Sequence, residues 1–280
     1  MVYVIVIVHG GTGRCLNKKF KGNIILAKKE VTEKVAENEI SEMSATEPNK
    51  KEKKAKKERK WWFFIPKAIL RLIIKKPKFK YLGDEIEEGS IILRNHEGAS
   101  GPLKLELYLN HSFRLWGAWE MNSHLGHVYT YLSKVYYHQK KHWPLFWARL
   151  FCVIAAPIVF LFYRGLNLIS TYPDARLKRT IKQSVATIEK GQSVVLFPED
   201  SSTGYHETLK AFLPGFTLFA KTCYKKGIDV PIYVAYLKKK TNTFVIDKPV
   251  KFSELYKDYQ EPEEIANILC NRINEIKDLI

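Results

Sequence analysis

Short apolar, strand-like runs alternate with helical stretches over most of this 280-residue chain, and that alternation constrains its fold more than any other feature. Strands are predicted at Ile91–Leu93, Phe113–Trp119, Asn167–Ser170, Ser193–Phe197, Val230–Leu237 and Thr243–Ile246. Helices are predicted at Leu103–Leu109, about 125–163, Leu177–Glu189, Leu213–Lys225 and Pro262–Leu279. Strands that alternate with helices of this length are typical of a sheet with helices on its faces. We therefore predict an α/β fold with a central mixed sheet flanked by helices.

Polar side chains follow two of the predicted strands. Asn95-His96 comes directly after Ser90–Arg94, and Glu199-Asp200 comes after Ser193–Phe197 and a proline. In open α/β sheets, ligands bind beyond the carboxyl ends of the strands. Histidine titrates nearest neutral pH and is the usual general base. We therefore expect these two strand ends to converge on one site, with His96 as its base.

Each of these residues also has a plainer interpretation. A histidine at the end of a strand often only hydrogen-bonds to backbone. Glu199 and Asp200 precede Ser-Ser-Thr-Gly, a run that suits a turn or a helix cap. Both readings stay open at this point.

The positive charge of the chain belongs to one short segment. The net charge is +17, yet residues 50–80 carry fourteen basic and two acidic side chains, whereas residues 81–280 carry twenty-five and twenty-one. The larger part of the chain therefore shows no electrostatic footprint for nucleic acid. Binding of DNA or RNA through residues 50–80 remains a third-ranked hypothesis, because no base-reading module accompanies the basic run.

Residues 61–76 have the pattern of a basic amphipathic helix headed by aromatic residues. Cations recur every four residues along one stripe and apolar residues form another: Lys67, Arg71, Lys75; Ile65, Ile69, Leu72, Ile73. Such helices lie in the headgroup plane of an anionic membrane. The alternative is a helix packed on the domain, with its lysines in solvent. We predict four regions: a short segment 1–28, a charged linker 29–60 without a core, a membrane-surface helix 61–80 and an α/β domain 81–280.

The longest apolar run, Leu150–Tyr163, has about fourteen residues. A membrane span needs roughly twenty, so this run predicts a buried or membrane-dipping helix. The four cysteines are scattered without a Cys-x-x-Cys pair, which fits a reducing cytosol and argues against a structural zinc site. His124/His127 and His138/His142 have helical spacing, but no further ligand cluster accompanies them, so we expect no metal.

Four segments, taken in order, resemble the motif blocks of the glycerolipid acyltransferase superfamily, the phosphatidic-acid-forming acyltransferases. The first block of that family, Asn-His followed by four residues and Asp, matches Asn95-His96. The third, Phe-Pro-Glu-Gly-Thr-Arg, resembles residues 197–202, and the fourth, a strand that begins Val-Pro, resembles 230–235. The second, Gly, a short strand and Arg, falls at 165–171. The resemblance covers about residues 80–260 and implies an acyltransferase-like α/β domain.

The resemblance also implies roles for individual residues. His96 would deprotonate an acceptor hydroxyl, which attacks an acyl thioester. The remaining blocks would position the acceptor or the imidazole. The predicted catalytic residues are His96 and Glu199, and the predicted substrate-binding residues are Asn95, Ser100, Asp200, Ser201, Ser202 and Arg164. No cofactor or metal is implied.

Departures from the family pattern shape the expected acceptor. Gly101 stands where the family has the Asp that orients the histidine, and Thr171 stands where it has the Arg. Asp200 and Ser202 replace the Gly and Arg of the third block. Phosphate is best held by a guanidinium fork, and an added carboxylate repels it. These changes favour a neutral or cationic acceptor.

The leading hypothesis is a peripheral acyltransferase on the cytoplasmic face of the cell membrane. Its expected partners are acyl-CoA or acyl carrier protein, a lipid acceptor and an anionic membrane surface. The alternative is a non-catalytic member of the same fold that binds lipid or acyl chains.

Overall fold

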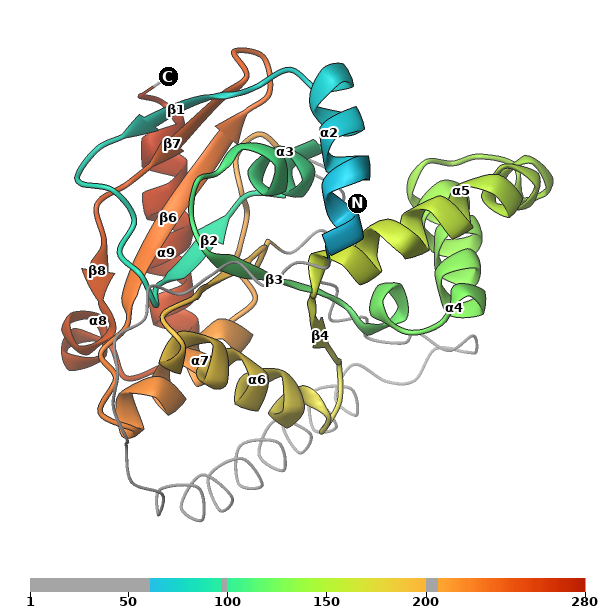
Figure 1. The fold of residues 1–280 in the computed structure, drawn as a ribbon. Helices are drawn as coiled ribbons and strands as arrows, with labels where there is room; N and C mark the ends of the chain where they lie inside the picture. The colour runs from blue at the N-terminus through green and yellow to red at the C-terminus, as the bar shows by residue number, and fades with distance from the viewer. Residues whose placement is uncertain (1–60, 97–99, 200–205, 280) are drawn as a thin grey trace, which may run out of the picture.

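The computed structural model describes residues 61–96, 100–199 and 206–279, which form one eight-stranded mixed sheet with helices on both faces (Figure 1). The strands lie in the order β1-β7-β6-β2-β5-β3-β4, and β8 pairs with β6. Their bounds are β1 Lys78–Tyr81, β2 Ile91–Arg94, β3 Phe113–Ala118, β4 Ile169–Thr171, β5 Ser193–Leu196, β6 Pro231–Lys238, β7 Thr243–Ile246 and β8 Val250–Lys251.

The centre of the sheet is parallel. β6, β2, β5, β3 and β4 pair parallel to one another, whereas β7 and β8 run antiparallel to β6. β2 lies between β5 and β6, with Leu93 opposite Leu196 and Val234. A central parallel strand is buried on both faces, which explains the unbroken apolar run Ile91-Ile92-Leu93. The carboxyl ends of β2 and β5 therefore lie side by side.

Two apolar cores, one on each face of the sheet, hold the helices in place. Ile91 and Leu93 point to the face covered by α6 (Leu177–Glu189), α7 (Gly215–Lys225), α8 (Phe252–Asp258) and α9 (Pro262–Lys277). Ile92 points to the other face, under the 3-10 turn η1 (Trp61–Phe63), α3 (Ser100–Tyr108), α4 (Leu125–Thr130) and α5 (Leu145–Leu166). Successive side chains of a strand point to opposite faces, so one strand supplies both cores.

The predicted fold class is confirmed, and most predicted elements are present to within two or three residues. The predicted strand Asn167–Ser170 is Ile169–Thr171, because Asn167 instead ends α5 with φ 51°, in the left-handed region that such caps favour. β1, β8 and α8 (Phe252–Asp258) were not predicted from the sequence. β1 pairs with β7, so the sheet begins at Lys78, inside the segment 61–80 that is predicted as a membrane-surface helix.

The predicted helical region at about 125–163 is three helices. α4 continues into the π-helix η3 (Tyr131–Lys140), and α5 begins after a break at which His142 has φ 57°. α5 is 22 residues long, so the apolar helix extends well beyond the fourteen-residue run seen in the sequence. α4 and η3 pack against α5 as a helical hairpin that lies to the side of the sheet (Figure 1).

Candidate functional site

His96 and Glu199 meet at the adjacent carboxyl ends of β2 and β5. The backbone N–H of His96 donates a hydrogen bond to Glu199 Oε2 over 3.0 Å. Both residues are almost fully buried, at 3% and 5% exposure. The imidazole also packs on the Phe197 ring, with 5.0 Å between the ring centres. The predicted convergence of the two strand ends is therefore present, although this hydrogen bond joins the carboxylate to the main chain of His96.

Asn95 ties the same strand end to β6. Its side-chain amide donates to the Leu237 carbonyl over 3.1 Å, and its Oδ1 accepts from the Leu237 N–H over 2.8 Å. This pair of bonds continues the β2–β6 ladder by one step beyond the last paired residue of β2, Arg94. The side chain of Asn95 thus holds the backbone just before His96 against β6.

A buried arginine connects the two sides of the His96 loop. Arg94 is fully buried, its Nε donates to the Asn95 carbonyl over 3.0 Å, and its Nη1 donates to the Gly101 carbonyl over 2.9 Å. Its guanidinium carbon lies 5.1 Å from the ring centre of Phe197 and 4.7 Å from that of Phe244. Two aromatic faces and two carbonyls are suitable surroundings for a buried guanidinium.

Gly101, where the acyltransferase pattern has Asp, lies against this arginine. A Cβ atom at position 101 would come within 2.6 Å of Arg94 Nη2 and within 2.6 Å of the His96 carbonyl oxygen. Neither neighbour is the free end of a flexible chain, because the guanidinium is buried between rings and the carbonyl is backbone. The packing therefore requires glycine here, and Arg94 fills the space beside it.

The backbone around Glu199 is fixed by contacts with the segment before α7, and the nearby thiol of Cys270 is not a nucleophile at neutral pH. Glu199 forms an isolated antiparallel bridge with Phe212, and the Leu213 N–H donates to the Pro198 carbonyl over 2.7 Å. Burial, and secondly the negative charge of Glu199, raises the pKa of the Cys270 thiol to about 11. Cys270 is therefore protonated at neutral pH. Among the residues around Glu199 that the structure describes, the imidazole of His96 is the group suited to proton transfer.

The structure places the other predicted site residues as follows. Ser100 is the first residue of α3, and its side chain lies outside the described part of the chain, as do Asp200, Ser201 and Ser202. Arg164 is exposed on α5, with its guanidinium carbon 5.3 Å from the centre of the Phe160 ring. Thr171, where the family pattern has Arg, is 8% exposed and donates from Oγ1 to the Gly117 carbonyl over 3.0 Å.

Sequence reasoning missed Arg94 as part of the site. A sequence feature could have indicated it: Arg94 is a charged residue at the end of an otherwise apolar strand, directly before Asn95-His96. Charged residues are almost never fully buried unless they are paired. The strand pattern therefore required a partner for Arg94, which proved to be the carbonyl of Gly101.

A second polar cluster lies at the ends of β3 and β4. The Arg176 guanidinium covers the rings of Tyr172 and Trp119, at 4.6 and 5.2 Å from their centres, and it forms a salt bridge with Asp174 over 2.7 Å. The rings of His124 and His127 are 3.7 Å apart. No group of three potential metal ligands occurs among the described residues, here or elsewhere.

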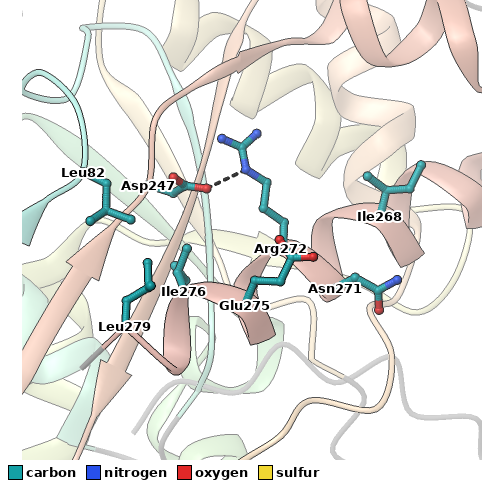
Figure 2. Close-up of a pocket in the computed structure, with 8 residues that line it drawn as sticks. All are labelled: Leu82, Asp247, Ile268, Asn271, Arg272, Glu275, Ile276 and Leu279. Atoms are coloured by element: carbon teal, nitrogen blue, oxygen red, sulfur yellow. Dashed lines mark hydrogen bonds and ion pairs between the residues drawn. The ribbon is translucent and has the colours of Figure 1, made fainter.

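A separate surface cavity of about 540 Å³ lies between β7 and α9 (Figure 2). Figure 2 shows the ion pair between Arg272 Nε and Asp247 Oδ2, 2.5 Å long, on one side of it. Its lining residues are Leu82, Asp247, Ile268, Asn271, Arg272, Glu275, Ile276 and Leu279. None of them is a predicted site residue, so this cavity is distinct from the His96 site.

No protein-family model matches the chain, and no curated protein matches it in sequence. Among solved structures, it is similar to the crystal structure of the 1-acyl-sn-glycerophosphate (LPA) acyltransferase PlsC from Thermotoga maritima. That match has 11% sequence identity and a TM-score of 0.41, and it covers 93% of this chain and 88% of PlsC. It is a distant likeness of fold.

Proposed function

We propose that this protein transfers an acyl group from a thioester donor to a hydroxyl of a lipid or lipid-like acceptor, with His96 as the general base. The observation that carries the proposal is the contact between His96 and Glu199, two residues predicted from separate segments and joined over 3.0 Å. The buried setting supports it, because His96 lies at the carboxyl edge of parallel strands, where ligands of such sheets bind.

The proposed reaction needs no group beyond the substrates and these side chains. A ring nitrogen of His96 takes the proton of the acceptor hydroxyl, and the oxygen attacks the thioester carbonyl carbon to form a C–O bond. The tetrahedral intermediate collapses, the C–S bond breaks, and the imidazolium returns its proton to the departing sulfur. The products are an ester and a free thiol. An alcohol is a weak nucleophile until a base removes its proton, which is the contribution of His96.

In this scheme, main-chain contacts hold the histidine. Glu199 accepts a hydrogen bond from the His96 N–H. Asn95, the residue before His96, is hydrogen-bonded through its side chain to Leu237 of β6, and Arg94 donates to the Gly101 carbonyl. The guanidinium of Arg94 is committed to two carbonyls and two aromatic faces, and Thr171 is committed to Gly117. These commitments support an acceptor without a phosphate group, in line with the expectation from the sequence.

Acyl transfer from labelled acyl-CoA or acyl carrier protein into a lipid extract tests the proposal. The wild-type protein should form a labelled ester, and His96→Ala should lower the rate by about 10²- to 10⁴-fold, the usual contribution of a general base. Equal rates in the two proteins would overturn the assignment.

The second candidate is a non-catalytic protein that binds lipid or acyl chains in the same place. The observation that favours it is Gly101, because the structure excludes an orienting Asp at this position. In serine proteases, loss of such an Asp costs about 10⁴-fold in rate. This candidate predicts lipid that co-purifies with the protein, detected by mass spectrometry, and no labelled ester.

A further inference from the structure

The helix α2 (Phe64–Ile73) turns its cations toward the protein and its apolar side chains outward. Lys67 Nζ pairs with the buried Glu106 over 3.3 Å. Arg71 donates from Nε and Nη2 to the Leu107 carbonyl over 3.0 and 2.6 Å, at the carboxyl-terminal end of α3, where a cation is favourable. Lys67 and Arg71 thus contact α3, and Arg71 also remains exposed to solvent.

The outward face of α2 is strongly apolar. Its exposed large side chains, with their exposed fractions, are Phe64 at 70%, Ile65 at 64%, Ile69 at 53%, Leu72 at 88% and Ile73 at 75%. Trp61, just before the helix, is 80% exposed. Single exposed apolar residues are normal on a protein surface, but a continuous stripe marks an interaction site.

α5 presents a second apolar stripe. It is long and apolar enough to cross a membrane, and only 17% of its most apolar window is buried. Its outward side chains recur at helical spacing: Trp147, Leu150, Phe151, Ile154, Ile158 and Leu161. A helix of this composition in the core of a soluble protein would be mostly buried, whereas α5 is largely exposed in this structure.

The two stripes belong to one packed unit. Phe63, directly before α2, packs on Phe162 of α5 with 5.1 Å between the ring centres. Gly165 of α5 allows this approach, since a Cβ atom there would come within 2.1 Å of Phe63 Cδ2. In Figure 1, α2 starts beside the carboxyl-terminal end of α5.

Charge selects the kind of partner. Beyond Lys67 and Arg71, which contact α3, residues 61–83 carry four basic side chains (Lys75, Lys76, Lys78, Lys80) and no acidic one. Residues 121–173, which contain the hairpin, carry five basic side chains and no acidic one. Apolar helices flanked by cations alone, with tryptophan at their ends, suit the surface of an anionic bilayer. Exposed Trp61, Trp143 and Trp147 are placed at such ends.

The topology excludes a simple crossing by α5. The chain enters the hairpin through α4 and leaves it through α5, and both ends return to the same sheet. If α5 crossed the bilayer, the return segment Leu125–Lys140 would have to cross as well. That segment contains Lys134, His138 and Gln139, and α5 is the one helix in the described part of the chain that is apolar enough to span.

We propose that α2 and α5 together form a bilayer-docking surface that lies in the plane of an anionic membrane, with both apolar stripes in the boundary between headgroups and acyl chains. Apolar burial supplies most of the binding, and the flanking cations select anionic lipid. This proposal does not rest on acyl transfer, because it uses neither His96 nor Glu199.

Flotation of the full-length protein with vesicles tests this surface. The vesicles contain phosphatidylcholine with or without phosphatidylglycerol, at about 0.1 M and about 1 M salt, where the screening length falls to about 3 Å. Wild type should bind both kinds of vesicle, more tightly when phosphatidylglycerol is present, and should stay bound at high salt. Leu72→Glu on α2 and Ile154→Glu on α5 should each weaken binding by about ten-fold or more, given the size of the buried side chain. Because both residues are exposed, at 88% and 73%, the variants should remain folded.

Leu279→Glu is the matched control. Leu279 is 53% exposed and lies beyond the end of α9, beside the cavity of Figure 2, so its substitution should leave flotation unchanged. Three outcomes would overturn the proposal: equal flotation of Ile154→Glu and wild type, release of wild type at high salt, or a lipid-free dimer that Ile154→Glu dissociates while wild type fails to float. The same variants assayed with a soluble acceptor keep this test separate from that of His96.

Discussion

At the scale of single residues, the His96 site is organised through the main chain. Glu199 binds the backbone of His96, Asn95 binds the backbone of Leu237, and Arg94 binds the carbonyls on both sides of the histidine. The family pattern would instead place an Asp at Gly101. The sequence could show that the Asp was missing, but only the packing shows that a buried guanidinium adjoins that position.

Two substitutions of Glu199 separate its hydrogen bond from its charge. Gln can still accept from the His96 N–H, so Glu199→Gln should cost less than about 1 kcal/mol of unfolding free energy. Leu cannot accept, so Glu199→Leu leaves a buried N–H without a partner and should cost about 1–3 kcal/mol. Urea unfolding measures both values, and equal costs would contradict the hydrogen bond to the main chain.

Gly101→Ala should destabilise the protein by about 1–3 kcal/mol, because the new methyl group meets Arg94 and the His96 carbonyl at 2.6 Å. Gly101→Asp should fail for the same reason to restore an orienting carboxylate. Gly215→Ala is the control, since nothing lies within 4 Å of a Cβ atom there and alanine favours the helix. Thermal or urea unfolding compares the variants, and a neutral Gly101→Ala would refute the close packing.

At the scale of elements, the short strands, the helix break and the orientation of α2 that the sequence did not predict all depend on contacts with other segments. β1 and β8 are only four and two residues long, and β1 is largely exposed, so neither has a continuous apolar signal. The break between η3 and α5 depends on His142 in a left-handed conformation. The orientation of α2 depends on Glu106 and Leu107, which lie in another helix. Periodicity along one segment carries no information about such partners.

The contact between η1 and α5 makes a testable prediction about Gly165. Gly165→Ala should cost about 1–3 kcal/mol, because the methyl group would overlap the Phe63 ring. In a Phe63→Ala background the same substitution should cost much less, since the ring is gone. A double-mutant cycle by urea unfolding gives the coupling between the two positions. Additive effects would show that Phe63 does not pack on Gly165.

At the scale of the whole molecule, the α/β fold and the convergence of two strand ends could be predicted because both follow from alternation and chain order. A parallel central sheet brings the residues after β2 and β5 together whatever the loops do. The role of Arg94 and the contacts of Lys67 and Arg71 with α3 could not be predicted, because each depends on contacts between distant segments. The sheet carries His96, while α2 and α5 present exposed apolar stripes.

The rate of labelled ester formation in a matched pair of histidine variants tests the central claim most directly. His111 lies at the amino-terminal ends of the parallel strands, away from His96. Its Nε2 is 2.7 Å from Oγ of Ser193, the first residue of β5. With acyl thioester and lipid extract, His111→Gln should keep nearly the wild-type rate, and His96→Ala should lose about 10²- to 10⁴-fold of it. Ester formation by His96→Ala at the rate of His111→Gln would contradict the account.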